Sequence, residues 1–298
     1  MDGILNVNKP AGITSFDVVS TVRHCLRQKR VGHAGTLDPS ATGVLPICLG
    51  KATRVTEYFM ELQKTYRAEI ELGIATDTGD AEGQVIRRGD ASGIDVETLL
   101  TVLGQYRGSV EQTPPMFSAI KYHGRPLYEL ARAGIIVERK TRKTEIYNLQ
   151  LLSWEYPVIT IEVTCSRGTY IRSLADDIGK SLNCGAHLTN LVRLRYGPFD
   201  INDSVPLSQL VELSERDDYS RLIYPLDSIL FHLPSVTLDA VAEQDIRHGR
   251  LLPASAVPDI SPAGEKIRYR AYNLDGLFVG VLLFNFEKSQ WLPEKVFI

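Results

Sequence analysis

The segment from Gly32 to Gly43, which reads GHAGTLDPSATG, is the part of this 298-residue chain that decides the fold. It is too rich in glycine and proline for a helix or a strand, so we predict an ordered loop. Such a loop can turn tightly and hold the Asp38 carboxylate toward a cleft. Taken alone, an aspartate followed by proline is more often a turn or helix-cap residue, so the flanking sequence must decide between the two roles.

Regular elements are predicted on both sides of this loop. Upstream, apolar residues recur at the spacing of one helix face after a capping residue, Thr14 or Ser15; they are Val18, Val19, Val22 and Leu26. Downstream, the apolar run VLPICLG at residues 44–50 is typical of a buried strand. The loop is thus predicted to lead from a helix with a basic end into a strand.

The rest of the chain alternates between strand and helix patterns. Residues 66–72 and 159–165 alternate apolar and polar side chains, as half-buried strands do, and residues 171–178 show a helical pattern that ends at Gly179. A helix near residues 239–248, closed by Gly249, precedes the strand-like runs RYRAY and LFVGVLLFNF. We predict an α/β (α+β) chain with a main domain at residues 1–230 and a small β-rich domain at residues 232–298.

Composition argues against several classes of protein. No apolar stretch approaches the roughly 20 residues needed to cross a bilayer, and the first residues lack the basic and apolar parts of a secretion signal. The four cysteines stand singly, without a CxxC pair or a histidine at ligand spacing. We expect a cytoplasmic protein with reduced thiols and without a metal ion or other cofactor.

Positive charge is concentrated in two segments, although the net charge is −3. Residues 1–60 hold 7 Lys and Arg against 4 Asp and Glu, residues 118–145 hold 7 against 3, and residues 61–117 hold 5 against 10. Segregated positive charge is what binding to a polyanion such as nucleic acid requires, although charge runs are also common on plain solvated faces. The stretch at about 113–143 is predicted to be a basic excursion from the main domain.

Several long motifs resemble, in the same order, those of the TruB family of bacterial tRNA pseudouridine synthases. The motifs are NKPAGITSFDVV, GHAGTLDPSATGVLP, KTYRAEIELG, PPMFSAIKYHGRPLYELARAG, CSRGTYIRSLADDIG and LTNLVRLRYGPF. The resemblance covers residues 3 to about 200 and extends more weakly, in the tail, to the family's small RNA-binding PUA domain. It implies a pseudouridine synthase fold with a central, mostly antiparallel sheet and a C-terminal PUA-like domain.

The resemblance also implies the reaction. Asp38 matches the aspartate that detaches uracil from its ribose, so that the base can turn and rejoin through carbon 5, at the uridine conventionally numbered 55 in the T-loop of tRNA. Whether this aspartate attacks the sugar directly or acts by way of a glycal intermediate stays open. Substrate and product are isomers, so the reaction requires no cofactor or metal ion.

Two further residues match catalytic positions of the family. Tyr66, in KTYRA, corresponds to the tyrosine that stacks on the displaced base and helps to remove the carbon-5 proton; on spacing alone it would be a strand aromatic in the core. Arg172, in GTYIRSL, corresponds to the arginine that pairs with the catalytic carboxylate, since a guanidinium fork can orient a carboxylate and keep it ionised. Alone, it would be a surface charge in the first turn of a helix.

Five residues match or suggest substrate-binding positions. The resemblance places Tyr170 and Leu191 at the uracil pocket, although both could equally be core residues. It also implies that His33 fills the gap left in the T-loop when the target nucleotide flips out. Without the resemblance, a histidine in this loop could be interpreted as a general base. Lys9 and Lys64 are candidate phosphate contacts, which position RNA without reading its sequence.

The expected partner is the T-arm of tRNA, bound by a monomer without guide RNA, protein partner or membrane. Related synthases that work within guide-RNA complexes share the TLDP core, but the HGRPLYELAR segment favours the stand-alone bacterial type. A second alternative is an RNA chaperone or binding module without catalysis, which the presence of Asp38, Tyr66 and Arg172 disfavours. A hydrolase or phosphatase would need a second carboxylate and metal ligands close by, and the loop supplies only one acid.

Overall fold

The computed structural model describes residues 1–118, 120–257 and 267–297. The chain divides into two compact units, the first made of Met1 and Gly3–Ile223 and the second of Asp2 and Tyr224–Ile298. Each unit is described by itself. Within the described ranges, every helix is too short or too polar to span a membrane.

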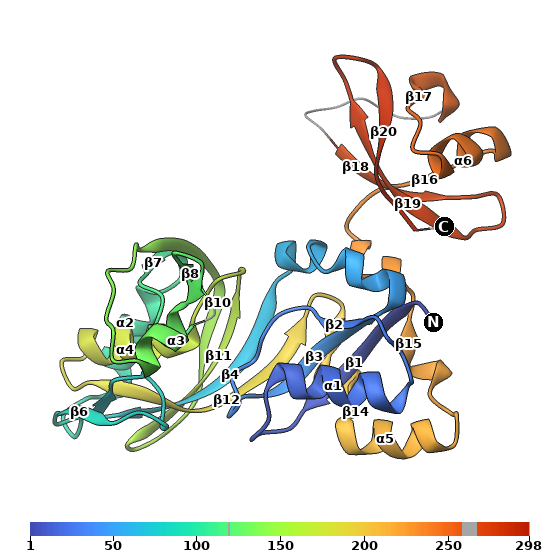
Figure 1. Ribbon diagram of the computed structural model, residues 1–298. Coiled ribbons are helices and arrows are strands. Elements are labelled where there is room, and N and C mark those ends of the chain that lie inside the picture. Colours follow the sequence, from blue (N-terminus) through green and yellow to red (C-terminus); the bar gives the residue numbers. More distant parts are fainter. Residues whose placement is uncertain (119, 258–266, 298) are drawn as a thin grey trace. The chain divides into compact units, whose positions relative to one another are not determined.

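A large, mostly antiparallel sheet forms the centre of the first unit (Figure 1). In spatial order its strands are β14 (Val205–Pro206), β1 (Gly3–Lys9), β3 (Thr42–Leu49), β12 (Ala186–Tyr196), β4 (Lys64–Leu72), β11 (Val158–Cys165), β10 (Arg142–Glu155) and β7 (Gly108–Gln112). The pairs β14–β1 and β3–β12 are parallel, and the other pairs in this order are antiparallel. The predicted α/β (α+β) class with a central, mostly antiparallel sheet is confirmed.

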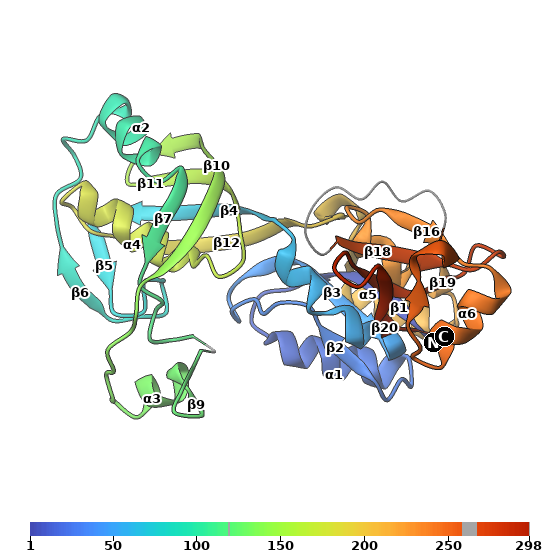
Figure 2. The ribbon, with the colours of Figure 1, turned by 90° about the horizontal axis from the view of Figure 1, so that it is seen from above.

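Strand β4 has a central place in this sheet because its alternating sequence buries one face. Tyr66, Ala68 and Ile70 are all buried in the main core, and burial of such apolar surface contributes about 25 cal/mol per Å². Across the sheet, Tyr66 is in register with Arg193 of β12 and Val163 of β11. Seen from above, β4 and β12 run between the half of the unit that holds α1 and the half that holds α2 and α4 (Figure 2).

Helices of the first unit pack on the sheet, apart from the one in the excursion described below. Those that pack on it are α1 (Ser15–Cys25), α2 (Val96–Gly104), α4 (Ile171–Ser181) and α5 (Leu207–Glu215). Helix α1 begins where predicted, because Thr14 and Asp17 form a capping box in which each side chain accepts a hydrogen bond from the backbone N–H of the other residue. Its buried residues include the predicted Val18, Val19 and Val22.

Helix α4 extends past the end that was predicted at Gly179. The helix continues to Ser181, and Gly179 is buried within it. A Cβ at this position would overlap the backbone of Gly185 and Ala186. The glycine is therefore a close-packing residue that lets α4 approach the start of β12, and not a helix-ending residue.

Short elements complete the first unit. They are β2 (Val31–His33), the 3-10 helices η1 (Gly50–Val55) and η2 (Tyr58–Glu61), β5 (Ile74–Thr76), β6 (Val85–Arg88), β13 (Phe199–Asp200), η3 (Ile201–Asp203), η4 (Ser220–Leu222) and β15 (Ile223–Tyr224). Strand β2 pairs with β3, β13 with β12, and β5 with β6. The predicted ordered loop is thus shortened at both ends, to residues 34–41 between β2 and β3.

The basic excursion at about 113–143 stands away from the sheet, as Figure 2 shows for α3 and β9. Apart from residue 119, which lies outside the described residues, it holds β8 (Lys121–Tyr122), β9 (Arg125–Pro126) and α3 (Leu127–Arg132). Arg139 donates a hydrogen bond from Nη1 to the carbonyl of Pro114, 2.9 Å away, and so ties the two ends of the segment together. Beyond it, β10 begins at Arg142.

The described residues of the second unit form a small sheet that packs against helix α6 (Ala240–Arg247). Its strands, in spatial order, are β16 (Ser235–Thr237), β18 (Ile267–Tyr272), β19 (Phe278–Asn285), β20 (Gln290–Val296) and β17 (Leu252–Pro253), and they are joined by η5 (Leu226–Leu230), α6 and η6 (Ala254–Ala256). Trp291 is fully buried in its core. The predicted β-rich C-terminal part is confirmed. The unit also includes residues before 232, since the Tyr272 hydroxyl donates to Asp227 across 2.6 Å.

Candidate active site

Lys9 and Ser15 anchor the loop that carries Asp38. The Lys9 ammonium is fully buried and donates to the carbonyls of Pro10, Pro39 and Ala41 at 2.9, 3.0 and 2.7 Å. The Ser15 hydroxyl accepts from the N–H of Leu37 at 2.9 Å and lies 3.1 Å from its carbonyl, to which it donates. The backbone on both sides of Asp38 is therefore fixed from β1 and from the first turn of α1.

Arg193 holds the far side of the same loop and was missed by the sequence reasoning. Its guanidinium is buried and donates from Nε to the carbonyl of Val44 at 2.6 Å and from Nη2 to that of Gly35 at 3.1 Å. Gly43 has a φ of 100°, and a Cβ there would overlap the backbone of Arg193. Only glycine lets β3 come this close to β12, so the pairing of the two strands fixes the end of the loop where β3 begins.

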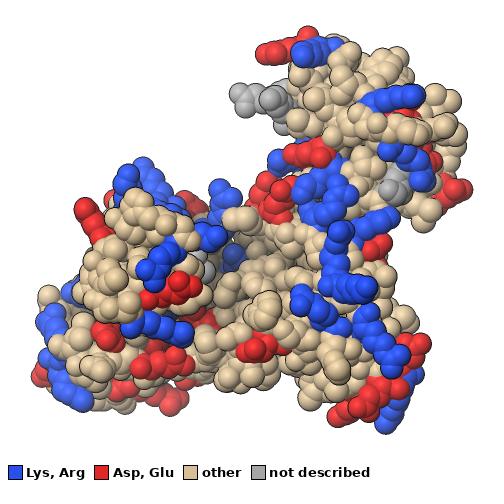
Figure 3. Space-filling view, viewed as in Figure 1, with Lys and Arg blue, Asp and Glu red and all other residues tan. Residues whose placement is uncertain are grey.

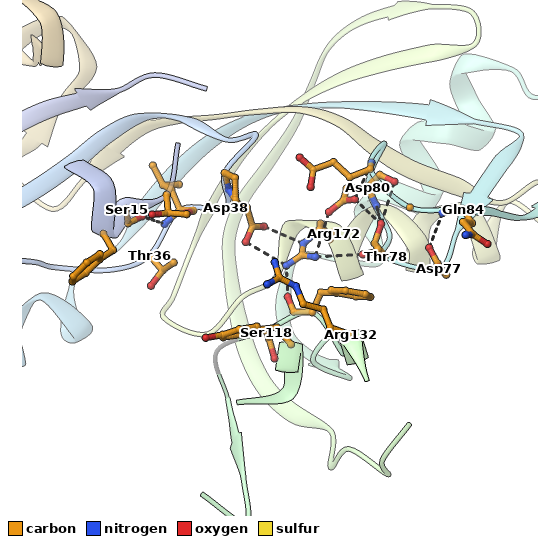
Figure 4. A pocket seen from close by; sticks show the side chains of 18 of the residues that line it. Ser15, Thr36, Asp38, Asp77, Thr78, Asp80, Gln84, Ser118, Arg132 and Arg172 are labelled. Carbon is orange, nitrogen blue, oxygen red and sulfur yellow. Dashed lines mark hydrogen bonds and ion pairs between the residues drawn. The ribbon is translucent and has the colours of Figure 1, made fainter. Parts of the chain in front are cut away.

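The Asp38 carboxylate faces the Arg172 guanidinium in a two-point contact (Figure 4). Arg172 Nε lies 3.1 Å from Asp38 Oδ2, and its Nη2 donates to Oδ1 at 3.4 Å. Arg172 stands in the first turn of α4, with its side chain only 7% exposed. A planar guanidinium that contacts both carboxylate oxygens fixes the orientation of the Asp38 side chain as well as its position.

Three further groups fix the Arg172 fork from other elements. Its Nη1 lies 3.3 Å from Asp80 Oδ2 and its Nη2 donates to the carbonyl of Phe117 at 2.7 Å, with a longer contact of 3.5 Å from Nη1 to the carbonyl of Thr78. The sequence reasoning missed Asp80. Its only signal was a carboxylate in the turn-rich stretch TDTGDAEG, which reads equally well as a plain loop.

The pKa of Asp38 is raised above the ordinary value of 3.8. Burial is the largest cause, and the Asp80 carboxylate adds to it, while the charges of Arg172 and Lys9 oppose the rise. The surroundings of the Asp38 carboxylate thus disfavour its negative charge, and the positive charge of the Arg172 guanidinium offsets part of this effect. Such surroundings are typical of reactive groups.

A pocket of about 650 Å³ opens over Asp38 and Arg172, which is within the usual range for a small-molecule or nucleotide site. It lies within the first unit. Its walls come from the start of α1, the Asp38 loop, the turn between β5 and β6, and the excursion; residues labelled in Figure 4 include Ser15, Thr36, Asp77, Thr78, Gln84, Ser118 and Arg132. Of the residues predicted for the site, Asp38, Arg172 and His33 line it.

Tyr66 is not among the residues that line the pocket. Its side chain belongs to the main core, with 8% of the residue exposed. Burial raises the pKa of the phenol above 10.0, and the Arg193 charge opposes that rise. Asp38 is among the charges that act on this phenol, so the two groups share one environment. The hydroxyl is protonated at neutral pH, and its part in removing a proton stays a prediction.

Tyr170 and Leu191 are partly buried and do not line the pocket. Tyr170 is the N-cap residue of α4; its N–H donates to Gln112 Oε1 at 3.0 Å, and Gln112 Nε2 returns a bond to its carbonyl at 3.3 Å. Burial raises the pKa of its phenol, on which Arg172 and Asp38 also act. Leu191 faces Ala68 of β4 in register and packs against the main core. Their predicted contact with uracil stays a prediction.

The three basic residues predicted to bind substrate have different surroundings. Lys9 is fully buried against backbone carbonyls, and burial lowers its pKa to about 8; this placement makes it an anchor of the loop and differs from the predicted phosphate contact. Lys64 is partly buried, with its ammonium 4.7 Å from the centre of the Tyr196 ring. Burial and the Arg193 charge lower the pKa of His33, so its imidazole is neutral at pH 7.

Lys and Arg gather on the surface of the first unit as the sequence indicated. Figure 3 shows basic side chains over the end of α1 and the η1 segment, and others over the excursion. The pocket wall between β5 and β6 is acidic instead, with Asp77, Asp80 and Glu82. Cationic surface thus flanks a pocket that carries carboxylates.

Comparison of the chain with known proteins identifies its family. Residues 23–171 match the model of the TruB family pseudouridylate synthase (N terminal domain), and residues 172–231 match that of the tRNA pseudouridylate synthase B C-terminal domain. A tRNA pseudouridine synthase B of Dehalococcoides mccartyi is 44% identical over 298 residues, covering 100% of this chain and 97% of that protein. One from Clostridium kluyveri is 44% identical over 284 residues, covering 94% and 95%.

Solved structures agree with the sequence relatives. A Cbf5–Nop10–Gar1 complex contains a chain that aligns with a TM-score of 0.78 at 27% identity, covering 99% of this chain and 84% of that one. An H/ACA RNP bound to a substrate RNA containing 2'-deoxyuridine aligns with a TM-score of 0.77 at 26% identity, covering 99% and 85%. The fold, with a carboxylate and a guanidinium at its central pocket, is that of a pseudouridine synthase. The chain belongs to the TruB family of pseudouridylate synthases and is therefore an isomerase.

Proposed function

We propose that the protein converts uridine 55 in the T-loop of tRNA into pseudouridine, with Asp38 as the nucleophile. The observation that carries this proposal is the Asp38 carboxylate, which Nε and Nη2 of the Arg172 guanidinium hold inside the pocket. The names of the sequence relatives, all tRNA pseudouridine synthase B, support tRNA as the substrate.

In the proposed reaction the target nucleotide leaves the RNA stack and enters the pocket. Asp38 detaches uracil from carbon 1 of the ribose, by direct attack or by way of a glycal. The base turns and its carbon 5 bonds to carbon 1 of the ribose, which in the direct-attack route breaks the bond to Asp38. Carbon 5 then loses its proton and nitrogen 1 gains one, so that product and substrate are isomers. Arg172 keeps the acid aimed at the sugar, and Tyr66 supports the base from beneath. His33, as a neutral planar ring, fills the gap that the base leaves, which offsets part of the lost stacking.

The proposed partner is the T-arm of free tRNA. The excursion and the basic surface near α1 would contact phosphates, and the second unit would act as a PUA-like RNA-binding domain. The proposed enzyme works as a cytoplasmic monomer without guide RNA or protein partners, in contrast to the complexes named for the structural neighbours.

The test is to incubate the full chain with an unmodified tRNA transcript and to map pseudouridine by chemical adduct formation and primer extension. We expect one new pseudouridine, at position 55. The matched transcript with cytidine at that position should gain none. Modification at another site, or only after addition of a guide RNA, would refute the assignment of substrate.

Replacing Arg172 with lysine should lower kcat by about 10² to 10³-fold and change KM much less, because lysine keeps the charge and loses the fork that orients the acid. The acid limb of the pH–rate profile should move little, because lysine keeps the positive charge that lowers the pKa of Asp38. The control is Arg195→Lys, which alters an exposed Arg–Asp200 pair on the same sheet. Equal kcat for both variants would show that the fork has no positioning role.

The pH dependence should follow Asp38. Only the ionised carboxylate can act as a nucleophile, and burial raises its pKa above 3.8. We therefore expect kcat/KM to fall on the acid side tenfold per pH unit, starting at a pH above that ordinary value. Single-turnover rates across pH 4 to 8, with Trp fluorescence to follow folding, check this. Constant activity down to pH 4 in a folded enzyme would argue against a carboxylate nucleophile with a raised pKa.

A further inference from the structure

Phe16 is an exposed aromatic residue at the active-site pocket. It is 63% exposed, and it lines the same pocket as Asp38 and Arg172. Most of the other residues that line this pocket are polar or charged. Single exposed apolar residues are common on protein surfaces, but an uncovered phenyl ring at a catalytic pocket is available to whatever enters.

The backbone of Phe16 is held in a fixed relation to the catalytic loop. It is the second residue of α1, between Thr14 and Asp17, which form the capping box that starts the helix. Its neighbour Ser15 is bonded through the hydroxyl to both the N–H and the carbonyl of Leu37, the residue before Asp38. The same few bonds therefore set the positions of the ring and of the catalytic carboxylate.

Another part of the pocket wall also presents an exposed aromatic ring. Tyr128 of α3 is 37% exposed, and the Arg132 guanidinium lies 5.7 Å from the centre of its ring. Both residues line the pocket, as Phe16 does. Planar rings and a guanidinium at the edge of a pocket suit flat aromatic ligands. In RNA, unpaired bases splayed from a loop are bound by stacking on such groups.

We propose that Phe16 is a base-stacking residue that positions the RNA, with its ring against the face of an unpaired base next to the uridine that enters the pocket. This inference rests on the proposed function, since that uridine is the reference point. The ring holds the neighbouring nucleotide while the target turns toward Asp38. It acts before the chemical step, so it governs RNA binding and not the rate at the carboxylate.

Substitutions at Phe16 test the stacking directly. Phe16→Ala should raise both KM and the Kd for the RNA by about tenfold, within the range for loss of one base–aromatic contact, while single-turnover kcat stays within about twofold. Phe16→Trp should restore binding, and Phe16→Leu, which keeps apolar bulk without a flat ring, should bind as weakly as Phe16→Ala. The control is Tyr147→Ala, a change at an aromatic residue of β10 that is 51% exposed and away from the pocket.

Abasic substitutions in the RNA identify the stacked base. One nucleotide at a time beside the target is replaced by an abasic residue, and Kd is measured with wild-type enzyme and with Phe16→Ala. At the stacked position the abasic change should weaken wild-type binding about tenfold and leave Phe16→Ala unaffected. Additive losses at every position would overturn the inference, as would full binding by Phe16→Leu.

These outcomes separate the inference from the proposed function. If wild-type enzyme forms no pseudouridine in tRNA, the proposed function fails whatever Phe16 does. If it forms pseudouridine and Phe16→Ala has wild-type Kd and KM, only the stacking role fails. Thermal unfolding of each variant shows whether the fold is intact, which we expect because the ring is exposed and the Thr14–Asp17 capping box is retained.

Discussion

Replacing Asp38 with asparagine is expected to abolish pseudouridine formation, by roughly 10⁴-fold or more, the scale seen when a nucleophile is removed from other covalent enzymes. The amide keeps the size of the carboxyl group and still accepts a hydrogen bond from Arg172, but it cannot attack carbon 1 of the ribose. RNA affinity should change little, because Arg172 and the pocket walls are retained. Single-turnover assays with radiolabelled tRNA, run with enzyme in excess, measure both quantities.

The same variant should be folded and at least as stable to heat as the wild type. Burial raises the pKa of Asp38, so its surroundings disfavour the charged form, and a neutral amide removes that cost. The control is Asp218→Asn, a change at an exposed carboxylate that pairs with Arg221, which should leave both activity and stability unchanged. An Asp38→Asn enzyme with full activity would disprove the nucleophile assignment.

Replacing Lys9 with methionine is expected to lower the free energy of unfolding of the first unit by about 1 to 3 kcal/mol. The change leaves the carbonyl of the buried Ala41 without the donor that Lys9 supplies, whereas the Pro39 carbonyl keeps a hydrogen bond from the N–H of Gly12. Since Lys9 holds the loop directly after Asp38, activity should fall as well, even under conditions where the variant is folded.

The two tryptophans allow this stability to be measured in the full chain. Trp154 lies in the first unit and Trp291 in the second, so a Trp291→Phe background makes fluorescence report on the first unit during urea unfolding. The matched control is Lys29→Met, a change at an exposed lysine, which should shift the free energy of unfolding by no more than about 0.5 kcal/mol. A similarly small shift for Lys9→Met would show that Lys9 is not an anchor.

Together these contacts orient the carboxylate of Asp38, the proposed nucleophile. Lys9, Ser15 and Arg193 each bind backbone atoms of the loop, from three different elements, and Arg172 binds its carboxylate. The Asp38 carboxylate is thereby oriented before the substrate binds, which reduces the loss of entropy that is needed to align the reacting groups.

Sequence by itself indicated the main helices and strands and, through the family resemblance, pointed to Asp38 as the proposed nucleophile. Apolar and polar residues alternate along β4, and apolar residues recur at helical spacing along α1. Both patterns show which face of the element is apolar, and they depend only on residues that are close together in the sequence. The loop around Asp38 could be recognised because its glycines and proline lie together in sequence. Arg172 was identified in the same way, through a contiguous motif.

Tertiary structure alone decided which groups surround that acid. Lys9 reaches a carbonyl 32 residues away, Arg172 meets Asp80 across 92 residues, and Arg193 reaches Val44 across 149. Spacing in the sequence does not predict such long-range contacts, because they depend on how strands such as β1, β3 and β12 are ordered in the sheet. A lysine near a loop was therefore interpreted as a surface phosphate contact, whereas in the folded chain its buried ammonium donates to three backbone carbonyls.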